Sequence, residues 1–111
     1  MIFRSTEIPV EERTDERSGT VKRLIGPEQM HEKNRLFAHV VLRPGAQVSY
    51  HRHQGEFEVF YFLSGAGEVD DNGVTSPIQA GDVMFTDDGQ SHAIKNTGES
   101  DLEYLALITR L

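Results

Sequence analysis

Short runs of β-branched and aromatic residues recur along the chain from Thr20 onward, separated by turn residues at intervals of roughly 8 to 12 residues. This rhythm is typical of antiparallel strands in a sandwich or barrel. No segment has a long amphipathic helical pattern, and we expect only one short helix, at residues 27–31 after Gly26. The predicted strands cover residues 20–25, 35–42, 48–53, 57–63, 66–70, 74–79, 83–86, 91–96 and 102–109.

The chain of 111 residues has the length of one domain. Residues 20–111 are expected to form a single all-β barrel domain, with tight turns where Asn72 and Gly73 supply positive-φ residues. Residues 1–19 are expected to form a charged N-terminal arm, because residues 9–19 are rich in Glu, Arg and Asp and only weakly apolar. A solvated surface helix is the alternative for this segment.

Charge and composition narrow the functional classes. The chain has 11 Lys and Arg against 18 Asp and Glu, a formal net charge of −7, which argues against a nucleic-acid partner. The longest apolar runs, residues 59–63 and 104–108, are far shorter than the roughly 20 residues of a membrane-spanning helix, so no membrane partner is expected. Charged residues precede any long apolar segment, which argues against a secretory signal, and we expect a cytoplasmic location.

Three of the five histidines have a spacing that suits a metal site. Because the chain has no cysteine, any metal must be held by imidazole and oxygen ligands. Residues two apart in a strand point to the same face, so His51 and His53 can reach one metal. Glu58 begins the next apolar strand, and His92 can deliver a third imidazole from across the barrel. Three imidazoles and one carboxylate suit a divalent first-row metal.

The spacing of these residues resembles the two sequence motifs of the cupin superfamily, and the resemblance covers about residues 36–108. One position departs from the pattern, since Asp87 stands where the second motif has proline; this removes a rigid turn residue but no ligand. The matching residues are Gly45, His51, His53, Glu58 and Gly65 in the first motif, and Gly81, Gly89, His92 and Asn96 in the second.

The resemblance implies a double-stranded β-helix, or jelly-roll, barrel that holds one divalent transition metal per chain: Mn, Fe, Ni, Cu or Zn. It implies His51, His53, Glu58 and His92 as the ligands. Glu56 has the same strand parity as Glu58 and is the alternative carboxylate, but the motif spacing favours Glu58. Glu56 is then expected beside the metal or at the rim of the site.

Strand parity also indicates side chains that could surround the metal. Gln47 and Ser49 share the parity of His51 and are expected to line a pocket. Four apolar residues are candidates for the walls, with plain core packing as the alternative for each. They are Phe60, Phe62, Met84 and Ile94.

The run at residues 57–63 is apolar on both faces, so it needs cover on each. One face is expected to line the barrel interior, and the other to meet an N-terminal strand or a second chain. The resemblance also implies a homodimer, and we expect one.

Three functions are compatible with such a site. A metal-dependent enzyme of the oxygenase, decarboxylase, isomerase or lyase type would act on a small anionic organic molecule, because a divalent metal with one carboxylate ligand keeps a positive charge. A non-catalytic module would hold a sugar or organic acid on the metal, and a structural metal would only stabilise the barrel. The enzyme is our leading hypothesis, although the fold does not select the reaction.

Overall fold

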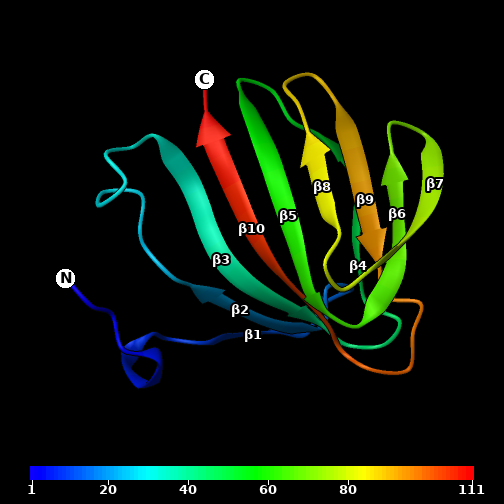
Figure 1. The fold of residues 1–111 in the computed structure, drawn as a ribbon, viewed down its shortest axis with the longest axis horizontal. Coiled ribbons are helices and arrows are strands. Elements are labelled where there is room, and N and C mark those ends of the chain that lie inside the picture. Colours follow the sequence, from blue (N-terminus) through cyan, green and yellow to red (C-terminus); the bar gives the residue numbers. More distant parts are fainter.

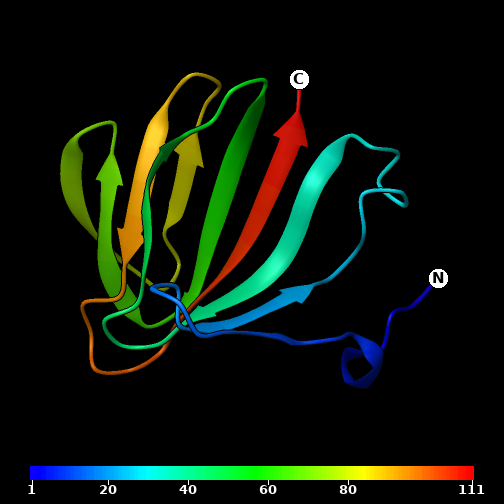
Figure 2. The same cartoon turned by 180° about the vertical axis from the view of Figure 1, so that it is seen from behind.

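Two antiparallel β-sheets make up the computed structural model, which describes residues 1–111. Its elements are η1 (Ser5–Glu7), β1 (Glu11–Arg13), β2 (Gly19–Arg23), β3 (Asn34–Leu42), β4 (Gln47–Arg52), β5 (Glu56–Ser64), β6 (Ala66–Asp71), β7 (Val74–Gln79), β8 (Val83–Thr86), β9 (Ser91–Lys95) and β10 (Leu102–Arg110). The larger sheet has the strand order β1-β2-β3-β10-β5-β8, and the smaller has the order β4-β9-β6-β7. Figures 1 and 2 show this arrangement from opposite sides, with β1 and β2 at one end of the larger sheet.

The predicted strands are present as β2 to β10, and no bound differs from its prediction by more than two residues. The all-β fold class is therefore confirmed, and two facing sheets with this strand order form a jelly-roll barrel. None of the helical structure is long and apolar enough to cross a membrane.

Residues 27–31 form consecutive turns rather than the predicted helix. The His31 N–H donates to the Glu28 carbonyl oxygen at 3.1 Å, and His31 and Glu32 then have φ angles of 54° and 59°. Left-handed residues cannot continue a right-handed helix. Pro27 therefore begins a series of turns and not a helix.

Part of the expected N-terminal arm belongs to the larger sheet. β1 pairs with β2, with Glu11 opposite Val21 and Arg13 opposite Gly19. A Cβ at Gly19 would lie 1.8 Å from the Val41 carbonyl oxygen, so only glycine lets β2 begin this close to β3. The sequence does not indicate β1 because residues 11–13 are all charged and lack an apolar alternation.

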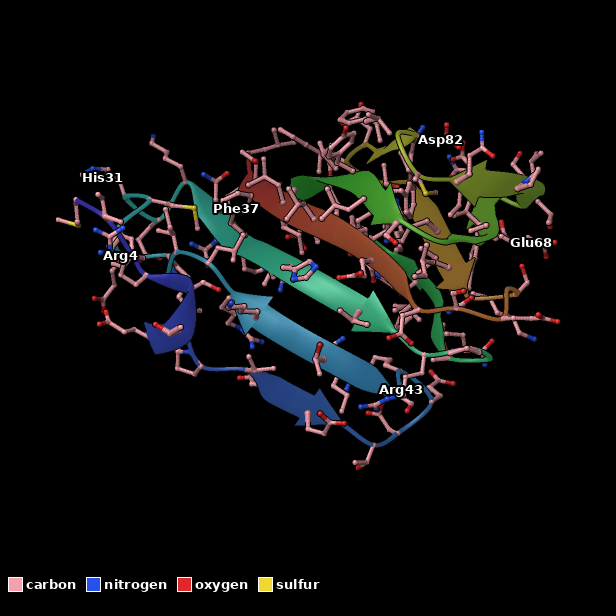
Figure 3. The ribbon with its side chains drawn as sticks, turned by 60° about the horizontal axis from the view of Figure 1, so that its bottom comes forward. Arg4, His31, Phe37, Arg43, Glu68 and Asp82 are labelled. Atoms are coloured by element: carbon pink, nitrogen blue, oxygen red, sulfur yellow. The ribbon has the colours of Figure 1, made fainter.

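The chain before β2 is also hydrogen-bonded to the loop after β3 and to the first residue of β4. The Arg43 N–H donates to the Ser18 carbonyl oxygen at 2.9 Å, and the Gln47 N–H donates to the Glu16 carbonyl oxygen at 2.8 Å. The Arg43 guanidinium pairs with Glu12, and Figure 3 shows Arg43 where β3 ends, beside the start of β2. Residues 11–19 thus lie against the barrel instead of forming a loose arm.

Alternate residues of facing strands fill the space between the sheets. Along β10 the even-numbered residues from Leu102 to Ile108 are buried, and Phe62 on β5 and Leu42 on β3 have no exposed surface. Removal of this apolar surface from water is the main stabilising contribution to such a barrel.

Asn96 joins the two sheets at the end of β9. Its side chain is buried, and its Nδ2 donates to the carbonyl oxygens of Leu42 and Ser100, at 2.8 Å each. Its Oδ1 accepts a hydrogen bond from the Gly98 N–H at 3.0 Å. The residue therefore stabilises the fold at the second motif without reaching the histidines.

We expect Asn96→Ala to lower the free energy of unfolding by about 2–4 kcal/mol, because it removes three hydrogen bonds and leaves buried backbone groups without these partners. Urea denaturation of the metal-free protein measures this difference. Asn34→Ala is the control, since Asn34 accepts one side-chain hydrogen bond, from Thr109, and should cost about 1 kcal/mol. Equal losses in the two variants would contradict the role of Asn96.

Candidate metal centre

Four side chains from the two sheets direct one ligand atom each toward a common point. They are His51 on β4, His53 directly after β4, Glu58 on β5 and His92 on β9, and we refer to them as the donor set. Their ligand atoms all lie within 4.8 Å of one another. His51 is the least buried of the four, and the other three are almost fully buried. The structure thus brings together the four residues that the motifs indicate.

Strand pairing and one loop position the histidines. His51 pairs with His92 across β4 and β9. His53 lies beyond the strand, where its N–H donates to the Gln90 carbonyl oxygen at 2.9 Å and its own carbonyl oxygen accepts from the Gly89 N–H at 2.7 Å. These two backbone hydrogen bonds hold His53 against the loop that precedes His92.

A β-bulge in β4 changes which side chains accompany His51. Val48 pairs with Ile94 and His51 pairs with His92, so three residue steps along β4 match two along β9. The extra residue reverses the alternation, and both Val48 and His51 line the interior.

The same bulge corrects the expected places of Gln47 and Ser49. Both side chains lie on the outer face of the smaller sheet and contact Glu16: the Ser49 hydroxyl donates to its carboxylate, and Gln47 Nε2 lies 3.4 Å from it. Counting strand parity from His51 fails because one residue between them is not paired. Neither side chain lines the interior cavity beside the donor set.

The spacing of the donor atoms fits a metal ion. Nε2 of His92 lies 3.2 Å from Nε2 of His51 and 3.1 Å from Nε2 of His53. Oε1 of Glu58 lies 3.0 Å from Nε2 of both His53 and His92. Ligands at adjacent corners of an octahedron are about 3.0 Å apart when the metal–ligand bonds are about 2.1 Å long. The donor set could therefore hold a divalent metal.

Hydrogen bonds to the outer ring nitrogens orient two of the imidazoles. Nδ1 of His51 donates to the Ser49 carbonyl oxygen at 2.7 Å, which leaves Nε2 with the free lone pair in the neutral ring. Nδ1 of His92 is hydrogen-bonded to the buried Thr86 hydroxyl at 2.7 Å. Sequence reasoning missed Thr86, because its position opposite Glu58 in the β5–β8 pair is known only from strand pairing.

Glu56 lies beside the donor set and outside it. Its Oε1 is 3.5 Å from Nδ1 of His53, and its Oε2 is 2.9 Å from Arg35 Nε. Burial would raise the pKa of Glu56, but the hydrogen bond and charge of Arg35, helped by His53, outweigh burial and lower it. Glu56 is thus an ionised carboxylate that contacts a ligand residue.

The buried charges of the donor set depend on each other. Burial would raise the pKa of Glu58, but its hydrogen bonds with His53 and His92 outweigh burial and lower it. The hydrogen bond to Glu58 also raises the pKa of His53, against the opposing effect of burial. A metal would require the neutral imidazole of His53, so metal affinity should fall as the pH falls through the raised pKa of this histidine.

A cavity of about 360 Å³ opens beside the donor set. Phe60 forms part of its wall and stacks on the His92 ring, with centroids 5.1 Å apart, and Tyr104 lies next to Phe60. The other three expected wall residues do not line the cavity, because their side chains fill the core between the sheets. They are Phe62, Met84 and Ile94.

Four arginines line this cavity, against two glutamates, Glu56 and Glu58. The whole chain has only 11 Lys and Arg and a net charge of −7, so the positive charge here is a local concentration. It makes the cavity attractive to anions. Sequence reasoning missed these residues because two of them lie in the segment expected to be an arm. They are Arg13, Arg17, Arg35 and Arg52.

Comparisons with known proteins show which family and which proteins this chain is similar to. The family model described as a cupin domain matches residues 38–108. An oxalate-binding protein of Thermotoga maritima is 50% identical over 115 residues, which covers 100% of this chain and 95% of that protein. A crystal structure described as a predicted oxalate decarboxylase of Thermotoga maritima superposes with a TM-score of 0.91, at 50% identity and with both chains fully covered. The cupin domain of Schizosaccharomyces pombe Cnp3 shares the fold, with a TM-score of 0.78 at 17% identity, over 98% of this chain and 73% of that one.

We expect Glu58→Gln to weaken the binding of Mn²⁺ or Zn²⁺ by more than about 100-fold, since loss of a residue that merely contacts a ligand already costs about 10- to 100-fold. Competition against a chromogenic chelator, with elemental analysis of bound metal, measures the change. Glu56→Gln is the matched control and should cost about 10-fold, at the low end of that range, because Glu56 lies 3.5 Å from the outer nitrogen of His53 and is not a member of the donor set. Equal losses would show that the carboxylate ligand is misassigned.

Proposed function

The chain belongs to the cupin family, and from this premise we propose that it binds one divalent transition metal and, at that metal, a small carboxylate of the oxalate class. The observation that carries the proposal is the cavity beside the donor set, in which four arginines line the wall together with His51, His53 and Glu58. A metal held by His51, His53, Glu58 and His92 would supply Lewis acidity toward a carboxylate oxygen. The relative named as an oxalate-binding protein supports this ligand class.

The residues of the chain select the ligand by size and charge. A cavity of about 360 Å³ lies at the small end of the roughly 300–1,000 Å³ that small-molecule sites occupy. The aromatic rings of Phe60 and Tyr104 form a wall that keeps water from one side of the ligand. The guanidinium groups offer paired N–H donors, which match a carboxylate.

The acid–base groups of the cavity favour binding over decarboxylation. Conversion of hydrogen oxalate to carbon dioxide and formate needs a group that delivers a proton to carbon. Glu56 is held as a carboxylate by Arg35, and burial together with Glu58 raises the pKa of Tyr104, so its phenol is a weak acid. A metal-dependent decarboxylase is the second candidate, because of the similarity to the structure described as a predicted oxalate decarboxylase.

Isothermal titration of oxalate into the Mn²⁺-loaded protein tests the proposal. We expect saturable binding that metal removal weakens by more than about 10-fold, because the metal supplies one of the charged contacts. Formate measured in the same samples separates the two candidates, since the binding protein releases none. A protein that binds Mn²⁺ but then binds no oxalate would contradict both candidates.

The outer face of β5 and β8 supports a homodimer. Tyr61 and Leu63 on β5 are 44% and 42% exposed, and Val83 and Phe85 on β8 are 64% and 52% exposed. Exposed apolar side chains gathered on one face of a sheet are typical of an interaction surface. The N-terminal strand does not cover this face, because β1 pairs at the opposite edge of the larger sheet. A second chain is therefore the proposed cover.

Light scattering at micromolar concentration should report twice the 12.5 kDa of one chain. Phe85→Glu should shift the protein toward monomer, because a charge at the centre of an apolar contact must be desolvated. Val74→Glu is the control, since Val74 is 65% exposed on β7 in the other sheet. A monomeric parent protein would contradict the dimer.

A further inference from the structure

Arg13 is a partly buried cation without a protein partner in the wall of the cavity. Among the cavity arginines, Arg17 pairs with Asp15 at 2.8 Å and Arg35 pairs with Glu56 at 2.9 Å, whereas Arg52 is unpaired but exposed to water. Arg13 makes no side-chain hydrogen bond or ion pair, although the chain has 18 acidic residues. Burial and the nearby charge of Arg17 lower the pKa of Arg13, which indicates a guanidinium that has lost water and gained no anion.

The register of the first two strands directs Arg13 to the interior. Arg13 pairs with Gly19, and Glu11 pairs with Val21, which is buried in the core. Paired residues and residues two apart share one face of an antiparallel sheet, so Arg13 lies on the face of Val21. Both residues line the cavity that adjoins the donor set.

Tyr104 places a second unused donor on the same wall. Its side chain is buried and lines the cavity, and its hydroxyl forms no hydrogen bond within the protein. Arg13 and Glu58 line the same cavity as Tyr104, so a ligand in this cavity can meet all three side chains. The phenol stays protonated because its pKa is raised, and it can therefore donate.

We propose that Arg13, together with the Tyr104 hydroxyl in the same cavity, binds the second carboxylate of the ligand, so that the cavity selects small dicarboxylates over monocarboxylates. This inference rests on the proposed function, in which the first carboxylate is held at the metal. A guanidinium can donate two parallel hydrogen bonds to a carboxylate, which is the strongest form of this contact. The ligand carboxylate would thereby pair with Arg13, which has no carboxylate partner within the protein.

The position of Arg13 in the chain separates this contact from the metal site. The family model matches residues 38–108, so β1 and β2 lie outside the matched segment. The donor set comes from that segment, whereas the proposed second contact comes from an added edge strand. Selection among carboxylates would then depend on residues that the family pattern does not contain.

Titration of the Mn²⁺-loaded protein with oxalate and with acetate tests the inference, because acetate has no second carboxylate. We expect Arg13→Gln to weaken oxalate binding by about 10-fold or more while acetate binding changes by less than about 2-fold. Arg13→Lys keeps the positive charge but lacks the paired donors. Its oxalate affinity should lie between those of the parent protein and Arg13→Gln. Elemental analysis should find unchanged metal content in both variants.

Arg23→Gln is the matched control, because it removes an arginine on β2 that pairs with Glu11 and does not line the cavity. It should leave oxalate binding unchanged. The inference is overturned if Arg13→Gln binds oxalate as the parent does, if it weakens oxalate and acetate by the same factor, or if Arg23→Gln weakens oxalate equally.

The metal-free protein distinguishes failure of this inference from failure of the proposed function. If the parent protein takes up no metal, the proposed function fails, but oxalate should still raise its melting temperature, and Arg13→Gln should abolish that rise. A rise that persists in Arg13→Gln overturns the inference alone. A parent protein that binds oxalate in neither form overturns both.

Discussion

The need to hold a buried carboxylate among three imidazoles governs the rest of this structure. Removing an ionised group such as Glu58 from water costs several kcal/mol unless its partners are placed well. Those partners, His53 and His92, lie after β4 and on β9, in the sheet opposite β5. A one-residue slip between β4 and β9 would turn His51 to the outer face. The barrel must therefore specify its register, and the hydrogen bonds of Asn96 at the end of β9 contribute to that.

The local sequence pattern predicts most of the strands and the donor set. The features that it fails to predict depend on pairing between strands that are distant in the sequence. Strand bounds follow from apolar runs and turn residues, and motif spacing indicates which histidines can meet. Gln47 and Ser49 are misplaced by parity because the bulge in β4 depends on its partner strand. Thr86 and Arg13 carry no local signal, since each acquires its place from the residue opposite in a neighbouring strand.

Most of the charged residues that line the cavity differ in sign from the net charge of the chain. The net charge of −7 describes a surface on which most arginines pair with a nearby carboxylate, as Arg23 does with Glu11 and Arg43 with Glu12. The cavity, in contrast, is lined by more arginines than glutamates. Coulomb interactions are stronger where water is excluded, so a partly buried, unpaired guanidinium such as that of Arg13 attracts an anion in the cavity more strongly than the screened surface carboxylates repel it.

An edge strand can bring a charged side chain to the cavity without disturbing the barrel. The donor set requires several strands in register, so a change in that register would disturb the geometry of the donor set and the fold together. β1 makes its pairing with β2 alone, and Gly19 sets how closely β2 approaches β3. A side chain at the end of β1 can therefore reach the cavity while the barrel keeps its core. An edge strand of three residues is thus sufficient to alter the charge of the cavity, because the barrel already supplies its shape.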